Sequence, residues 1–108
     1  MIHTVTPQQA QELMLQGDVD VVDVRELSEW HCGHIAGARH VPLAQLRANP
    51  KAALPRDGII FVCAAGVRSE TAARLAHSHG LTKLYNLGGG TRGWHKAGLP
   101  LVCEASAA

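Results

Sequence analysis

Short apolar runs alternate along the chain with longer stretches of mixed polarity. The runs Val19–Val24 and Ile59–Val62 are rich in β-branched and other apolar residues, which is typical of strands buried on both faces of a sheet. Three shorter runs predict further strands at Ile2–Val5, His40–Val41 and Leu84–Leu87. Because stretches with helical signals separate these runs, the pattern predicts an α/β fold with a parallel sheet and helices on both faces.

Helix start and stop signals fall between the predicted strands. Thr6 begins a helix with a capping box closed by Gln9, and Gly17 ends it. A second long helix follows Arg68 and ends at Gly80. Shorter helical turns are predicted at Glu26–His31, at Leu43–Ala48 and around Trp94, and turns without helix are predicted at Asn49–Pro50 and Pro55–Gly58.

The composition is that of one globular domain. The 108 residues suffice for a single core spanning residues 1–108, with the tail at 104–108 predicted to be disordered. The net charge is only +1 and the basic residues are scattered, which argues against nucleic-acid binding. No apolar run is long enough to cross a bilayer and no secretory signal is evident, so we expect a cytoplasmic protein without a membrane partner.

The chain contains three cysteines and seven histidines. An odd number of cysteines argues against a disulfide framework. His and Cys residues are dense only at His31–His34 and His77–His79, and neither segment has the paired spacing of a structural zinc site. We therefore predict no metal and no cofactor.

Cys63 is the residue most informative about chemistry. It ends the apolar run Ile59–Val62 and stands just before the second long helix; the residues that follow it are Ala64, Ala65, Gly66, Val67, Arg68 and Ser69. A thiolate at a helix N-terminus is stabilised by unpaired N–H groups and by the helix dipole, and Arg68 adds a positive charge. Such surroundings lower the pKa of a thiol and make it available as a nucleophile.

The residues after Cys63 predict a binding loop. Ala64, Ala65 and Gly66 are small, so their N–H groups can turn inward and form a cradle for an anion. No bulky residue follows that could bury the sulfur, so we expect it to be partly open rather than a structural core cysteine. Ser69 either forms a hydrogen bond with a bound substrate or caps the helix, and capping is the commoner role of serine at such a position.

Several segments together form a recognisable set of motifs. They read C-x-x-G-x-R-S at Cys63–Ser69, D-x-R at Asp23–Arg25, G-H-I-x-G-A at Gly33–Ala38, and a triple glycine at Gly88–Gly90 followed by Trp94. In their order along the chain they resemble the motifs of the rhodanese family, and they cover nearly the whole chain. The resemblance implies a single rhodanese domain with a five-stranded parallel sheet, and sulfur transfer through a cysteine persulfide.

The length of the loop bears on its substrate. Four residues separate Cys63 from Arg68, whereas the related cell-cycle phosphatases and arsenate reductases use a loop one residue longer, which cradles a tetrahedral anion. The shorter loop favours sulfur over phosphate. The resemblance thus implies a sulfurtransferase in which Cys63 takes sulfur from a small donor such as thiosulfate and passes it to cyanide or a thiol, while Arg68 and the loop N–H groups hold the anion.

Three alternatives remain open. The first is a persulfide carrier or sensor that hands its sulfur to a protein acceptor, which would use the same Cys63. The second is a phosphatase or arsenate reductase, which the loop length disfavours. The third is a catalytically inactive interaction module, which the presence of Cys63 disfavours.

The sequence gives weaker evidence for a functional role of residues outside the loop. Arg25 and Arg92, which follow predicted strands, are candidates for the rim of the pocket. Asp23 is predicted to form an ion pair or loop hydrogen bonds, His34 to be a structural histidine and Trp94 to lie in the core.

Cys32 and Cys103 are the two other cysteines. Either could act as a resolving thiol that attacks a Cys63 persulfide. We favour the simpler hypothesis that both are incidental, because a resolving thiol requires a geometry that sequence does not reveal.

Overall fold

The computed structural model describes residues 2–103, so the predicted disorder at 104–108 lies outside the described residues. The strands are β1 (Ile2–Val5), β2 (Asp20–Asp23), β3 (Arg39–His40), β4 (Ile59–Val62) and β5 (Leu84–Leu87). The helices are α1 (Pro7–Gln16), α2 (Leu27–His31), α3 (Leu43–Ala48), α4 (Pro50–Ala53), α5 (Val67–Ser78) and α6 (Gly90–Lys96).

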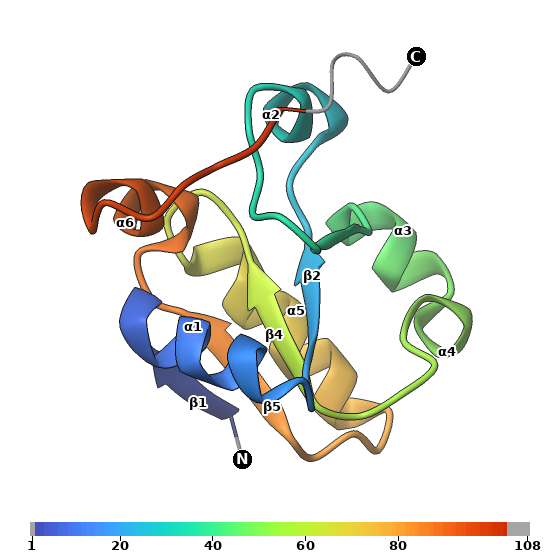
Figure 1. The fold of residues 1–108 in the computed structure, drawn as a ribbon. Helices are drawn as coiled ribbons and strands as arrows, with labels where there is room; N and C mark the ends of the chain where they lie inside the picture. Colours follow the sequence, from blue (N-terminus) through green and yellow to red (C-terminus); the bar gives the residue numbers. More distant parts are fainter. Residues whose placement is uncertain (1, 104–108) are drawn as a thin grey trace.

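The five strands form one sheet with the order β1-β5-β4-β2-β3, and every pair is parallel (Figure 1). The predicted α/β fold with a five-stranded parallel sheet is therefore confirmed. β4 occupies the centre, as expected of the most apolar strand, and all four of its residues are buried. Because the strands are parallel, the carboxyl ends of β2, β4 and β5 meet at one edge of the sheet, where ligands of open α/β sheets bind.

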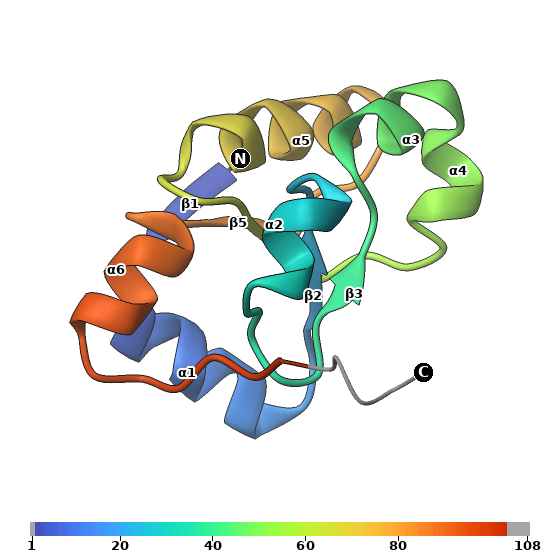
Figure 2. The same ribbon diagram turned by 90° about the horizontal axis from the view of Figure 1, so that it is seen from above.

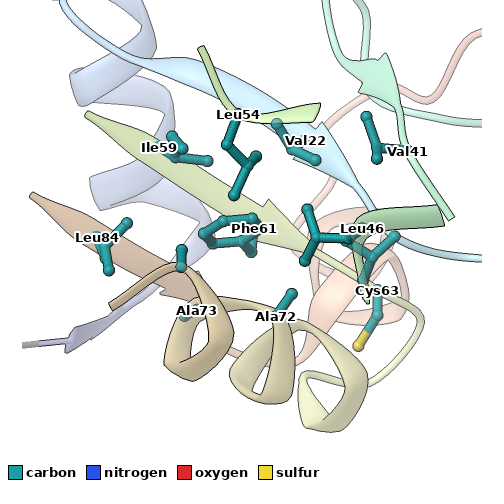
Figure 3. Packing of buried hydrophobic residues seen from close by; sticks show 12 residues of the cluster. Val22, Val41, Leu46, Leu54, Ile59, Phe61, Cys63, Ala72, Ala73 and Leu84 are labelled. Atoms are coloured by element: carbon teal, nitrogen blue, oxygen red, sulfur yellow. The ribbon is translucent and has the colours of Figure 1, made fainter. Parts of the chain in front are cut away.

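Helices cover both faces of the sheet, as the alternation of strands and helices predicts (Figure 2). Side chains of a strand alternate between its faces, so Phe61 of β4 points to one side and Ile60 to the other. Phe61 packs in a cluster with Leu46 of α3 and with three alanines of α5, Ala72, Ala73 and Ala76 (Figure 3). Ile60 packs in a second cluster with residues of α1 and α6.

Local signals account for the start of α1 and of α4. The predicted capping box at Thr6 is present, with the Gln9 N–H donating to the Thr6 hydroxyl at 3.1 Å and the Thr6 N–H donating to the Gln9 side chain at 2.9 Å. The prediction of a turn at Asn49–Pro50 is wrong at its second residue. Pro50 is instead the first residue of the short helix α4, a position where its missing N–H costs nothing.

The carboxylate of Asp57 joins the loops that precede β4 and β5. It accepts hydrogen bonds from the N–H groups of Gly58, Thr82 and Lys83 and from the Thr82 hydroxyl, at 2.9–3.0 Å. Burial raises the pKa of Asp57, but these donors outweigh it and lower the pKa to about 2. The charged form is thus the one that the fold stabilises.

Replacing this carboxylate should weaken the fold in a pH-dependent way. We expect Asp57→Asn to lower the free energy of unfolding at pH 7 by about 1 kcal/mol, because the hydrogen bonds lose their charged acceptor at a partly exposed site. Since the folded pKa is depressed, this contribution is present above the ordinary pKa of 3.8 and fades as the pH falls through about 2. Urea denaturation of both proteins from pH 7 to pH 2 measures it, and a difference that stays constant over this range would contradict it.

Candidate active site

Cys63 follows β4 at the carboxyl edge of the sheet, but its sulfur is not open. The residue has the same strand parity as Phe61 and lies in the same hydrophobic cluster, on the α5 face of the sheet (Figure 3). Its exposed fraction is 1%. The prediction of a partly open sulfur is therefore wrong: the fold places Cys63 in a core cluster with Leu46 of α3 and Ala72 of α5, although its sequence neighbours alone left it unprotected.

The sulfur is nevertheless surrounded by hydrogen-bond donors. The Gly66 N–H donates to Cys63 Sγ at 3.0 Å, and Ser69 Oγ lies 3.3 Å from it. Burial raises the pKa of the Cys63 thiol, but hydrogen bonding by Ser69 and by the N–H groups of Gly66 and Ala65 outweighs burial. The pKa of Cys63 is consequently lower than that of an ordinary cysteine, as the loop sequence predicts.

Gly66 makes this arrangement possible. It is the N-cap of α5 and has a φ of +101°, a left-handed conformation that side chains rarely adopt. The turn directs its N–H back toward the sulfur before the chain enters the helix. Ala65 and Val67 on either side are exposed, so the crest of the loop lies on the surface above a buried thiol.

Ser69 does not cap the helix. The N-cap of α5 is Gly66 and has no side-chain bond, while the Ser69 hydroxyl lies inside the first turn, donates to Asn86 Oδ1 and faces Cys63. The predicted capping role is therefore wrong: Ser69 is fully buried, and its partners are Cys63, which follows β4, and Asn86 of β5.

Asn86 is a member of the site that the sequence analysis missed. It has the same parity on β5 as Leu84, pairs in register with Phe61 and points to the α5 face. Its amide nitrogen donates to the Gly66 carbonyl at 3.1 Å. A polar residue at a core-facing position of an apolar strand is the signal that could have identified it, because buried polar groups require partners.

The start of α6 supports the loop from the other side. The N–H of Thr91 donates to the Cys63 carbonyl at 2.8 Å, and the N–H of Arg92 donates to the Ala64 carbonyl at 3.1 Å. Gly90, with a φ of +59°, lets the backbones approach this closely, since a Cβ there would collide with the carbonyl groups of Cys63 and Ala64. Arg92 thus contributes its backbone to the loop, while its side chain is exposed.

Arg68 is engaged by an acidic residue of α2. Its two terminal nitrogens bind the Glu29 carboxylate at 2.7 and 2.8 Å. The hydrogen bond from Arg68 is the main reason why the pKa of Glu29 falls to about 2, and Glu29 in turn raises the pKa of Arg68, to which the charge of Cys63 also contributes. The one loop cation is therefore near the sulfur and already neutralised by an ion pair.

Arg25 lies in the interior rather than on an exposed rim. Its exposed fraction is 5%, and its guanidinium binds the buried carboxylate of Asp23 and the carbonyls of Glu29 and Gly33. The ion pair predicted for Asp23 is present at 2.8 Å. This pair holds the segment from β2 to α2, and so fixes the element that carries Glu29.

Cys32 and Cys103 are both exposed, whereas Cys63 is buried, and all three are free thiols. Cys103 donates a hydrogen bond to the carbonyl of His31 at 3.1 Å, and Cys32 lines a separate hollow of about 480 Å³ with His95 and Leu99. A resolving role for either remains a prediction. Within residues 2–103, no three His, Cys, Asp or Glu side chains gather closely enough to hold a metal ion.

The fold and the cysteine loop together define a rhodanese-like domain. The family model of that description matches residues 6–97, and the chain belongs to this family, which confirms the resemblance seen in its motifs. In the part of the chain that the structure describes, no helix has the length and apolar character needed to span a membrane.

Relatives of known name agree with this assignment. The chain is 37% identical to thiosulfate sulfurtransferase GlpE of Pseudomonas fluorescens over 90 residues, which cover 83% of this chain and 82% of that protein. It is 36% identical over 76 residues to the putative sulfur carrier protein YrkF of Bacillus subtilis, covering 70% of this chain and 41% of the relative. This chain spans about half the length of YrkF and of two further curated relatives that it matches. The crystal structure of a rhodanese-related protein from Thermoplasma volcanium matches with a TM-score of 0.82 and 31% identity, over 93% of this chain and 97% of that one.

The close approach of the Gly90 backbone to that of Cys63 and Ala64 should be essential for the structure of the loop. We expect Gly90→Ala to lower the free energy of unfolding by about 3 kcal/mol, because the new Cβ would displace the backbone of Cys63 and Ala64. Gly98→Ala is the matched control, since it has a φ of +85° but no atom within 4 Å, and should cost only about 1 kcal/mol. Equal losses in urea denaturation would contradict the steric explanation.

The Glu29–Arg68 pair should set the affinity of the loop for anions. We expect Glu29→Gln to let sulfate protect Cys63 from alkylation at a concentration about threefold to tenfold lower, because a negative charge beside the loop is removed. Adding Arg68→Gln to this variant should abolish the gain. Protection that is unchanged or weaker in Glu29→Gln would show that the carboxylate does not oppose anion binding.

Proposed function

We propose that this protein is a sulfurtransferase that carries a sulfur atom as a persulfide on Cys63. The Cys63 thiolate attacks the outer sulfur of a small anionic donor such as thiosulfate, so that a new S–S bond forms and sulfite leaves with the electron pair of the old one. A nucleophilic acceptor, cyanide or a thiol, then attacks the outer sulfur of the persulfide and releases the thiolate. This is covalent catalysis in two half-reactions, without a metal or cofactor.

The observation that carries the proposal is the convergence of donors on one sulfur. The N–H groups of Ala65, Gly66 and Ser69 all stabilise a negative charge at Cys63. The same groups can stabilise the anionic outer sulfur of a persulfide, because they are fixed before the reaction begins. The positive charge of Arg68 adds to the attraction of an anionic donor, reduced by its pairing with Glu29.

The enclosure of the sulfur favours a small donor. Cys63 has an exposed fraction of only 1%, so a donor reaches it only as the loop above it yields. Thiosulfate requires much less room than an aryl phosphate. This argues against the phosphatase alternative, and the four-residue spacing from Cys63 to Arg68 argues against both the phosphatase and the arsenate reductase alternatives.

A persulfide carrier that serves a protein acceptor is the second candidate. It is favoured by the neutralisation of Arg68, which leaves less positive charge for a dianion such as thiosulfate, and by the likeness to a protein named as a putative sulfur carrier. Ready loading from organic persulfides with slow turnover of thiosulfate would distinguish this candidate from the enzyme. Either role suits a reducing compartment such as the cytoplasm, where Cys63 stays a thiol.

Intact-mass measurement tests persulfide formation directly. We expect the reduced protein to gain the mass of one sulfur atom when incubated with thiosulfate, and to lose it again when cyanide is added. Cys63→Ser should gain nothing, because the nucleophile is absent.

The variants Cys32→Ser and Cys103→Ser are the matched controls, since they remove exposed thiols and leave the buried one. Both should keep the full mass gain. A protein that takes no sulfur from thiosulfate but does so from an organic persulfide would support the carrier, and failure with both donors would overturn the proposal.

A further inference from the structure

Asn86 connects the two groups that contact the Cys63 sulfur. Its amide nitrogen donates to the carbonyl of Gly66 at 3.1 Å, and its Oδ1 accepts the hydroxyl proton of Ser69. Ser69 Oγ in turn lies 3.3 Å from Cys63 Sγ. Ser69 and Asn86 are 0% and 4% exposed, so water does not substitute readily for a lost partner.

The orientation of the Asn86 amide is fixed by chemistry. The Gly66 carbonyl can only accept a hydrogen bond, so the NH2 group of Asn86 must face it. The other end of the amide, Oδ1, therefore faces Ser69 and can only accept. It follows that the single proton of the Ser69 hydroxyl is directed at Asn86 and away from the sulfur.

This leaves Ser69 with one proton for two acceptors. When Cys63 is a thiol, its S–H can donate to Ser69 Oγ and both contacts are satisfied. When Cys63 is a thiolate, Ser69 can donate to the sulfur only by releasing Asn86 Oδ1, which would leave a buried acceptor without a partner.

We propose that Asn86 is a positioning residue that holds the Ser69 proton away from Cys63, and so disfavours the thiolate relative to states of Cys63 without negative charge on Sγ. A persulfide is such a state, because its charge lies on the outer sulfur and Ser69 can remain bonded to Asn86. This last step rests on the proposed function, whereas the argument about the proton rests on the hydrogen bonds alone. Asn86 would then favour the sulfur-loaded protein over the empty thiolate.

The pH dependence of Cys63 alkylation by iodoacetamide tests the proton argument without any sulfur transfer. The background is Cys32→Ser with Cys103→Ser, so that only Cys63 reacts. Asn86→Leu is compared in this background with and without Ser69→Ala. We expect Asn86→Leu to raise the thiolate fraction more when Ser69 is present than in Ser69→Ala. The two increases should differ by a factor of about three to ten, which corresponds to the strength of one neutral hydrogen bond.

The same comparison can overturn the proposal. Asn86→Leu also removes the bond to Gly66, and this effect is the same in both backgrounds because it does not involve Ser69. Equal shifts with and without Ser69 would therefore mean that Asn86 acts only by anchoring the loop.

A second readout needs no substitution at Asn86 and so survives a variant that fails to fold. The side-chain amide resonance of Asn86 can be followed by NMR as Cys63 is titrated in the same background. We expect it to move as the thiol ionises, and to move much less in Ser69→Ala, where no hydroxyl proton changes partner. Identical movement in both proteins would contradict the proposal.

Loading at a fixed ratio of thiosulfate to sulfite tests the consequence for the persulfide. We expect the ratio of loaded to empty protein to fall in Asn86→Leu by the factor found in the alkylation experiment, and an unchanged ratio would overturn this step. If the parent protein takes no sulfur at all, the proposed function fails, while alkylation still decides whether Asn86 controls the Ser69 proton.

Discussion

The arrangement of the site depends on one constraint: the chain must pass from β4 into α5 within a few residues while keeping peptide N–H groups directed at a single sulfur. Gly66 satisfies it with a left-handed turn that side chains rarely adopt. The helix that follows contributes the N–H of Ser69, and the loop contributes those of Ala65 and Gly66. A buried sulfur would ordinarily disfavour ionisation, and it is this set of donors that reverses the balance.

The neighbouring elements hold this turn in place from three directions. From β5, Asn86 binds the Gly66 carbonyl, and the N-terminus of α6 binds the carbonyls of Cys63 and Ala64. From α2, Glu29 holds the only cation of the loop. All three elements reach the loop because the parallel sheet brings the carboxyl ends of its strands to one edge. The sheet order thus explains why residues far apart in sequence form one site.

The sequence was sufficient for the strands, the parallel sheet and the cysteine loop, because apolar periodicity and local capping signals are short-range and strong at these positions. It was not sufficient for contacts made across the sheet. Cys63 lies in a core cluster with Leu46, which belongs to α3, and the role of Ser69 depends on Asn86, which lies in β5. Arg25 looked like a rim residue because it follows a strand, yet the two carbonyls that draw its guanidinium inward belong to the segment after it. The errors at Cys63 and Ser69 concern partners that only the tertiary fold identifies.

Because Cys63 belongs to the hydrophobic core, its position limits which core residues can be substituted during evolution. Phe61, Leu46 and Ala72 pack in the same cluster as Cys63, so a substitution that repacks this face of the sheet also alters the surroundings of the proposed nucleophile. The cluster formed with α1 and α6 does not include Cys63, so repacking it does not directly change the residues around the sulfur. Neutral drift and stabilising changes should therefore accumulate more freely on the α1 face, while the α5 face evolves under joint selection for folding and chemistry.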